Sequence, residues 1–183
     1  MKQLFFIIFL FFISCNTSNE VKEIEILTYF SNAKKFSVYS TIDKNGFTQS
    51  LFKKEESSYI DNCQSRIRKS LIDSIINVCR DKNDEDFIIK NPKKYIFDSY
   101  HHSVRITYEN GKKIEFIFSS FNEENKQFIP FQSLSNQIQS DSLNSTHLEI
   151  GQYGNLKIKQ EDLSNITIKK DSIQNAKYWK KRT

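Results

Sequence analysis

Histidine, cysteine and serine are the residues of this chain whose types could support metal or covalent chemistry. His101 and His102 are neighbours in a segment that alternates between apolar and polar residues. Neighbouring residues of a strand point to opposite faces, so we expect this pair not to share one metal ion. The sequence contains neither HExxH nor CxxC, the spacings typical of zinc sites. It therefore predicts no metal ligands.

Serine, glycine and the acidic runs give no sign of a catalytic site either. No serine stands in a GxSxG elbow, and the four glycines provide no phosphate-binding loop. Acidic runs such as Asp84–Asp86 favour a solvated surface over a catalytic pair of carboxylates. We assign no catalytic residue and no cofactor, although a cleft with His101 beside Asp98 would favour an enzyme.

Cys63 and Cys79 fall on the apolar stripe of a predicted helix over Asp61–Arg80, with Asp61 as N-cap and Gln64 in the capping-box position. Sixteen residues of helix separate the two cysteines by about 24 Å. A disulfide needs Cα atoms within about 7 Å. We therefore expect two buried thiols.

Cys15 follows a segment with a different pattern. Lys2 precedes ten apolar residues, Leu4–Ile13, and Ser14 comes directly before the cysteine. Ten residues of helix span about 15 Å, half of a hydrocarbon core, so this segment is too short to cross a membrane. The layout is typical of a secretory signal peptide with a cysteine at the cleavage point.

Phe12-Ile13-Ser14-Cys15 resembles the lipobox of bacterial lipoproteins. The resemblance implies that Cys15 becomes the mature N-terminus and carries the acyl chains. Asn16 is not the Asp that retains some lipoproteins at the inner membrane, so the resemblance favours the outer membrane. Three triplets also resemble an O-glycosylation acceptor of some Gram-negative bacteria: Asp73-Ser74-Ile75, Asp141-Ser142-Leu143 and Asp171-Ser172-Ile173.

The resulting organisation has one folded unit. We predict a signal peptide over 1–14, a lipidated cysteine and tether over 15–23, a single domain over 24–170 and a basic tail over 171–183. Removal of Lys2 with the signal lowers the net charge from +5 to +4. Basic and acidic residues are interleaved along the chain, which predicts a solvated surface and no nucleic-acid partner.

The first predicted hairpin pairs Ile42 with Phe47 and Val38 with Leu51. Asp43–Gly46 then forms the loop, and Gly46 takes the position that needs positive φ. The second hairpin pairs Tyr108 with Ile114 across a three-residue Asn-Gly-Lys loop.

The remaining pattern completes the sheet. Ile117 lies between Phe116 and Phe118, so we expect a central strand that is covered on both sides. Other predicted elements are a first strand over 24–30, an uncertain segment over 81–100, a helix opened by Pro130, a third hairpin joining 148–150 to 156–158 and an edge strand over 166–168.

These elements predict an α+β fold, in which an antiparallel sheet built from hairpins carries two amphipathic helices on one face. The element order and the Asn-Gly-Lys turn resemble small bacterial lipoprotein domains of unknown function. We expect a lipid-anchored, non-catalytic binding module of the cell envelope. The expected binding surfaces are the uncovered sheet face and Asp84–Tyr100, and the expected partner is an envelope protein or a polysaccharide. An envelope hydrolase, an immunity or inhibitor-type protein and a structural spacer are the alternatives.

Overall fold

A computed structural model of the chain describes residues 20–30, 36–53, 60–88, 100–119, 126–142 and 153–180. The helices and strands follow one another along the chain. They are β1 (Val21–Phe30), β2 (Phe36–Asp43), β3 (Phe47–Lys53), β4 (Ile60–Arg66), α2 (Lys69–Cys79), the 3-10 helix η1 (Asp84–Phe87), β5 (Tyr100–Tyr108), β6 (Lys113–Ser119), the 3-10 helix η3 (Lys126–Phe128), α3 (Ile129–Ser142) and α4 (Tyr153–Lys180).

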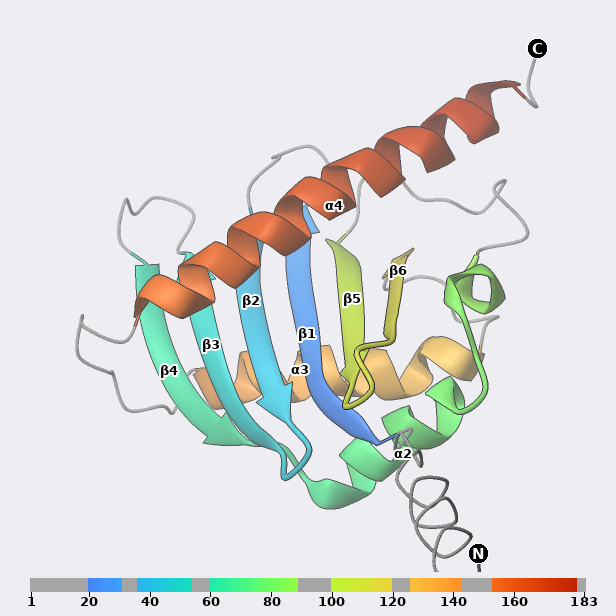
Figure 1. The fold of residues 1–183 in the computed structure, drawn as a ribbon. Coiled ribbons are helices and arrows are strands. Elements are labelled where there is room, and N and C mark those ends of the chain that lie inside the picture. The colour runs from blue at the N-terminus through green and yellow to red at the C-terminus, as the bar shows by residue number, and fades with distance from the viewer. Residues whose placement is uncertain are drawn as a thin grey trace, which may run out of the picture.

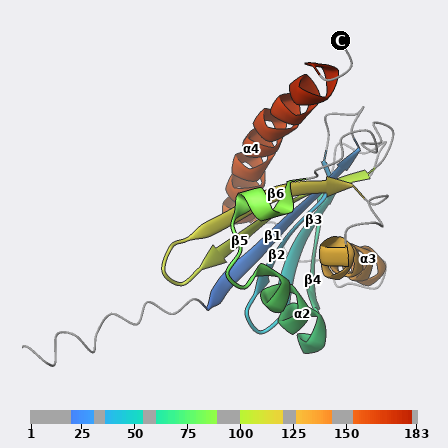
Figure 2. The same ribbon diagram turned by 90° about the vertical axis from the view of Figure 1, so that its right-hand side faces the viewer.

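The strands form one antiparallel sheet in the order β4-β3-β2-β1-β5-β6. Helices α2 and α3 lie on one face of this sheet, and α4 crosses the other face (Figure 1). The view from the side shows the sheet between these two helical layers (Figure 2). We refer to the two sides of the sheet as the α2/α3 face and the α4 face.

The main hydrophobic core fills the α2/α3 face. Alternate residues of the central strands, such as Ile24 and Ile26 of β1, contact the apolar sides of α2 and α3. Aromatic rings close the core near β6, where Phe116 stacks on Phe87 of η1 at 4.1 Å between ring centroids. The predicted stripe of α3 is confirmed, since its three apolar residues are all buried: Phe131, Leu134 and Ile138.

The α+β class, the antiparallel sheet and the two helices on one face are therefore confirmed. The first strand is also confirmed, although it begins at Val21. The expected uncovered sheet face is wrong, because α4 covers it. Residues 171–180, which were assigned to the tail, continue helix α4.

Both predicted hairpins form, but with other registers. In the first, Ile42 pairs with Thr48, a shift of one residue that moves Leu51 to the α4 face. In the second, Ile106 pairs with Ile114, a shift of two residues that leaves every side chain on its predicted face. The bond from Tyr108 N–H to the Lys112 carbonyl closes this hairpin around three loop residues, Glu109–Gly111, so the loop keeps its predicted length but begins one residue earlier. Strand β6 lies at the sheet edge, although Ile117 is buried as expected.

The predicted helix over Asp61–Arg80 is wrong in its first half. Ile60–Arg66 forms strand β4, which pairs with β3, and the helix begins only at Lys69. Arg68 has an extended backbone, with φ −61° and ψ 132°, and separates the two elements. Spacing of four between apolar residues favoured one helix, but pairing with β3 satisfies the backbone of Asp61–Arg66 and determines its conformation.

The third hairpin and the edge strand over 166–168 are also wrong, since Tyr153–Lys180 is one helix. Leu156 and Leu163, seven residues apart, pack against the sheet, whereas Ile158 and Ile168 are exposed. Residues 148–150 lie outside the described part of the chain. No helix within the described ranges is both long and apolar enough to cross a membrane.

Gly46 and Gly111 test how far each hairpin turn depends on glycine. Gly46 has φ +81°, as predicted, and a Cβ there would lie 2.4 Å from the Ile67 carbonyl oxygen. Gly111 has φ +82°, but a Cβ there would meet nothing within 4 Å.

We expect Gly111→Ala to lower the free energy of unfolding by about 1 kcal/mol, from backbone strain alone. Gly46→Ala should cost about 3 kcal/mol, because the strand connection at Ile67 must also move.

Urea denaturation of both variants measures the difference. Equal losses for the two glycines would contradict the close contact between Gly46 and Ile67.

Candidate functional site

Buried charge distinguishes the α4 face from the α2/α3 face. Its apolar contacts are confined to a small cluster: Leu27, Tyr29, Tyr39, Leu51, Leu156 and Leu163. Glu25 and Arg105 are buried beside this cluster, in the middle of the sheet. Ionised side chains are almost never fully buried unless they are paired. The α4 face therefore contains a polar centre that requires specific partners.

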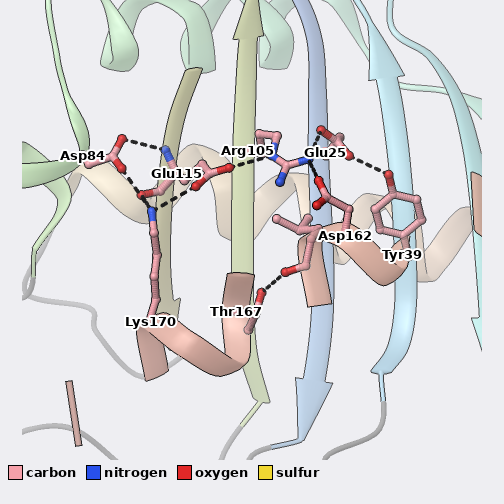
Figure 3. Close-up of polar contacts among 9 residues, drawn as sticks. Glu25, Tyr39, Asp84, Arg105, Glu115, Asp162, Thr167 and Lys170 are labelled. Carbon is pink, nitrogen blue, oxygen red and sulfur yellow. Dashed lines mark hydrogen bonds and ion pairs between the residues drawn. The ribbon is translucent and has the colours of Figure 1, made fainter. Parts of the chain in front are cut away.

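Arg105 of β5 is that centre (Figure 3). The sheet register places Glu25 of β1 directly opposite on one side and Glu115 of β6 directly opposite on the other. Arg105 Nη1 lies 3.3 Å from Glu25 Oε2, and Arg105 Nε lies 2.8 Å from Glu115 Oε1. The side chains of Arg105 and Glu25 are only 5% and 4% exposed. Strand pairing thus brings Glu25, which is 80 residues from Arg105 in the sequence, to the same guanidinium as Glu115 of the neighbouring hairpin strand.

Helix α4 supplies a third carboxylate to the same guanidinium. Asp162 Oδ2 lies 2.8 Å from Arg105 Nη1, and Figure 3 shows the Asp162 side chain pointing from the helix towards Arg105. Tyr39 of β2 completes the group by donating a hydrogen bond of 2.7 Å to Glu25 Oε1. Arg105 therefore uses its planar donor array to bind carboxylates from two strands and one helix.

The protonation states follow from burial and from these neighbours. Burial alone would lower the pKa of Arg105, but Glu25 and the hydrogen bonds to Glu115 and Asp162 raise it above its ordinary value. Burial raises the pKa of Glu25 above 4.5, against the lowering by the Tyr39 hydrogen bond and by Arg105. Burial and the nearby Glu25 raise the pKa of Tyr39, which keeps its hydroxyl a donor. The site is suited to holding carboxylates in place.

Two lysines of α4 extend the contact along the sheet. Lys159 Nζ lies 2.6 Å from Glu23 of β1. Lys170 Nζ lies 3.0 Å from Asp84 of η1 and 3.3 Å from Glu115. Both lysines are partly exposed, and ion pairs of this kind contribute about 0–1 kcal/mol each. Their value lies in setting the position of α4 on the sheet.

Two buried polar side chains of this face are not satisfied. Among the described residues, both amide atoms of Asn62 and the hydroxyl of Ser119 have no hydrogen-bond partner. Asn62 is 1% exposed and Ser119 is 2% exposed. Asn62 pairs with Leu51 in the sheet, and Ser119 shares the face of Glu115. An unmade hydrogen bond at a buried group costs about 1–3 kcal/mol, so a polar partner for either side chain would stabilise the domain.

The sequence-predicted site residues lie elsewhere. Cys15, the assigned lipidation site, is outside the described residues. Cys63 and Cys79 are buried and form no disulfide within the described chain, as expected, but they belong to β4 and α2. The 24 Å helical separation was therefore the wrong reason. Burial raises the pKa of Cys79 to about 12, which keeps it an unreactive thiol.

The histidine pair behaves as its spacing predicts. His101 and His102 alternate along β5, so His102 shares the α2/α3 face with Val104 and His101 shares the α4 face with Arg105. His102 Nδ1 lies 3.0 Å from Thr28 Oγ1 and 3.4 Å from Ser135 Oγ. Within the described ranges, no group of three or more His, Cys, Asp or Glu side chains is placed to hold a metal ion.

The described residues include only part of one other predicted binding surface, and they include serines of the motifs that resemble a glycosylation acceptor. Of the segment Asp84–Tyr100, the structure describes η1 and Ile88 at one end and Tyr100 at the other; residues 89–99 lie outside the described residues. Ser74 of the first of these motifs lies in α2 and donates a hydrogen bond to the Ser70 carbonyl.

Sequence reasoning missed the Arg105 centre. Glu25, Arg105 and Glu115 each fall within a predicted strand at a position outside the apolar alternation, and interleaved charges of this kind predict a solvated surface. The alternation of opposite charges in neighbouring strands was a usable signal. The buried Ile117 on the same face was another, since it indicated a second covering layer.

Comparison with known proteins gives no relative for this arrangement: no family model matches the chain, and no curated protein and no solved structure is significantly similar to it.

Arg105→Met tests the electrostatic centre. It leaves Glu25 buried without its cation, so we expect the free energy of unfolding to fall by about 3–5 kcal/mol. Asp162→Asn removes an exposed partner and should cost about 1 kcal/mol or less. Adding Glu25→Gln to Arg105→Met should recover part of the loss. Urea denaturation of the single and double variants measures the coupling, and additive effects would contradict a direct Glu25–Arg105 interaction.

His102 should make folding sensitive to acid. Burial and the neighbouring His101 lower the pKa of His102 to about 3 from 6.5. The unfolded chain therefore takes up the proton first as pH falls. This contribution to stability is complete above pH 6.5 and is lost towards pH 3, at up to about 1.4 kcal/mol per pH unit.

The measurement is urea denaturation between pH 7 and pH 4. His102→Asn should flatten the loss of stability by about one proton relative to the unchanged chain. Thr28→Val is the matched control, because it removes the hydrogen bond at 3.0 Å but keeps the histidine and its pH dependence. An unchanged slope in His102→Asn would show that this histidine does not control the acid transition.

Proposed function

We propose that this protein is a lipid-anchored protein of the bacterial cell envelope that acts by binding another envelope protein. Two features support the proposal. The pattern Met1–Cys15 supports the anchor, since it resembles the signal and lipobox of lipoproteins. The Arg105 centre supports binding, and it is the observation that carries the functional conclusion.

The chemistry of arginine favours recognition. A guanidinium does not lose its proton in proteins, so Arg105 cannot exchange a proton with a substrate at neutral pH. It can hold a carboxylate in a defined position by charge-assisted hydrogen bonds. In this structure it does so for Asp162, a residue presented by a helix. The α4 face is thus already engaged in recognising a helix.

The length of the tether gives the anchored domain an orientation. Val21 begins β1 six residues after Cys15, a span of at most about 20 Å. The β2–β3 and β5–β6 turns lie at this same end of the sheet, because Lys44 pairs with Glu109 at 3.8 Å and Glu109 N–H donates to the Glu20 carbonyl. We therefore propose that these turns face the membrane. The opposite end, where β1 finishes and β5 begins, faces away (Figure 1).

Cys15→Ala tests the anchor. We expect the unchanged chain to incorporate labelled palmitate and to sediment with membranes, and the variant to do neither. Cys63→Ala is the matched control and should still be labelled, because Cys63 is a buried thiol of β4. Equal labelling of Cys15→Ala and the unchanged chain would exclude lipidation at Cys15.

Binding is tested separately by crosslinking and affinity purification from solubilised envelopes. A partner recovered at a constant ratio with both the unchanged chain and Cys15→Ala would show that the domain itself recognises it. Recovery of no partner in either sample would contradict the binding function and favour an assay for hydrolase activity.

A further inference from the structure

We propose that the α4 face is a binding site for a basic helix of a partner protein, and that α4 occupies this site as an internal substitute. The inference rests on the proposed binding function but not on the lipid anchor. It identifies the surface that binds, the kind of segment that fits it and the element that must leave first.

The sheet retains its charge pairing when α4 is absent. Two of the three carboxylates around Arg105, Glu25 and Glu115, belong to strands, and so does Tyr39. Only Asp162 comes from the helix. Loss of α4 therefore does not leave Arg105 unpaired. The site exists in the sheet itself and can accept a carboxylate from another helix.

Helix α4 is held by weaker contacts than the helices of the other face. Leu156 and Leu163 are its contribution to the buried apolar clusters, whereas α2 and α3 both enter the main core. Its ion pairs use side chains that are partly exposed, including Asp162 at 58%. Such pairs are weakened by solvent and salt. Helix α4 should therefore open before the rest of the domain.

Charge complementarity indicates the occupant. The groups that form the Arg105 centre or pair with the lysines of α4 are four carboxylates, those of Glu23, Glu25, Asp84 and Glu115, and the guanidinium of Arg105. The net charge of this group is −3. A helix with cations at its ends and a carboxylate at its centre would complement it, as α4 does.

The spacing within α4 defines the pattern that the site recognises. Lys159 and Lys170 are eleven residues apart, about 16 Å along a helix, and Asp162 lies between them. Leu156 and Leu163 fall on the same side of the helix. A partner helix should therefore begin this pattern with an apolar residue, in the place of Leu156. Counted from that residue, we expect a cation three positions later, a carboxylate six positions later, a second apolar residue seven positions later and a second cation fourteen positions later.

Two polar groups at the edges of this face offer hydrogen bonds that α4 does not make. Asn62 of edge strand β4 and Ser119 of edge strand β6 are buried, yet their side-chain polar atoms have no partner among the described residues. A different helix that offers polar side chains at these two positions would bind with a gain that α4 does not obtain.

The test uses the full chain and a labelled synthetic peptide of residues 153–170. Asp162→Lys places a cation against Arg105 and should release α4. Glu161→Lys is the matched control, because it makes the same charge change at the neighbouring exposed position.

Peptide binding is measured by fluorescence anisotropy at low salt. We expect Asp162→Lys to bind the peptide at least tenfold more tightly than the unchanged chain, and Glu161→Lys to bind it as the unchanged chain does. A peptide with Lys159→Glu and Lys170→Glu should lose at least tenfold in affinity.

Hydrogen exchange identifies what each variant has released, and Leu163→Asn serves as a second releasing variant. Loss of amide protection in α4 alone, without peptide binding, would overturn the proposal. Continued protection of α4 in both variants, or loss of protection throughout the sheet, would show that α4 is an integral part of the fold and would also overturn it. Peptide binding without recovery of any envelope partner would support the helix-binding site and contradict the proposed function. Recovery of a partner without peptide binding would support the proposed function and contradict the helix-binding site.

Discussion

Burial of the Arg105 guanidinium between two carboxylates is the interaction on which the α4 side of this protein depends. A charge at the middle of a sheet is tolerated only if its partners are fixed in place. The register of β1, β5 and β6 provides that, since Glu25 and Glu115 stand directly opposite Arg105 on its two neighbouring strands. A shift of one residue in the pairing of β5 would move the guanidinium to the apolar α2/α3 face. Burying the Arg105 ion pairs carries a desolvation cost, but it also disfavours the wrong strand registers.

The two faces of the sheet differ in the kind of side chains that they bury. The α2/α3 face buries aliphatic and aromatic side chains from several strands and both helices, and this continuous core accounts for the stability of the fold. The α4 face combines a few apolar contacts with ion pairs, and its buried Asn62 and Ser119 have side-chain polar atoms without a partner among the described residues. Most of the buried apolar contacts thus lie on one side of the sheet and the buried charges on the other, so the proposed release of α4 would leave the main core in place.

Prediction from the sequence succeeded where short-range chemistry and alternation agreed. The turn at Gly46 and the apolar stripe after Pro130 were both correct, because each depends on a few neighbouring residues. The second hairpin was displaced by two residues and still kept its faces, whereas the first was displaced by one and exchanged them. Alternation specifies which side a residue faces within one strand, but the position and length of the loop that aligns two strands depend on turn hydrogen bonds such as Gly46 N–H to the Asp43 carbonyl.

Larger errors arose where distant segments decide the conformation. Asp61–Arg66 has helical spacing of apolar residues but lies in the sheet because β3 supplies its hydrogen bonds. Residues 153–180 suggested strands from scattered isoleucines, although the two leucines that contact the sheet have helical spacing. By itself, the sequence determined the fold class, the apolar faces of β1 and α3 and the opposite orientations of His101 and His102, since these follow from local periodicity. Only the tertiary structure decided that Glu25, Arg105, Glu115 and Asp162 meet, because that meeting requires strand pairing and helix docking between segments up to 137 residues apart.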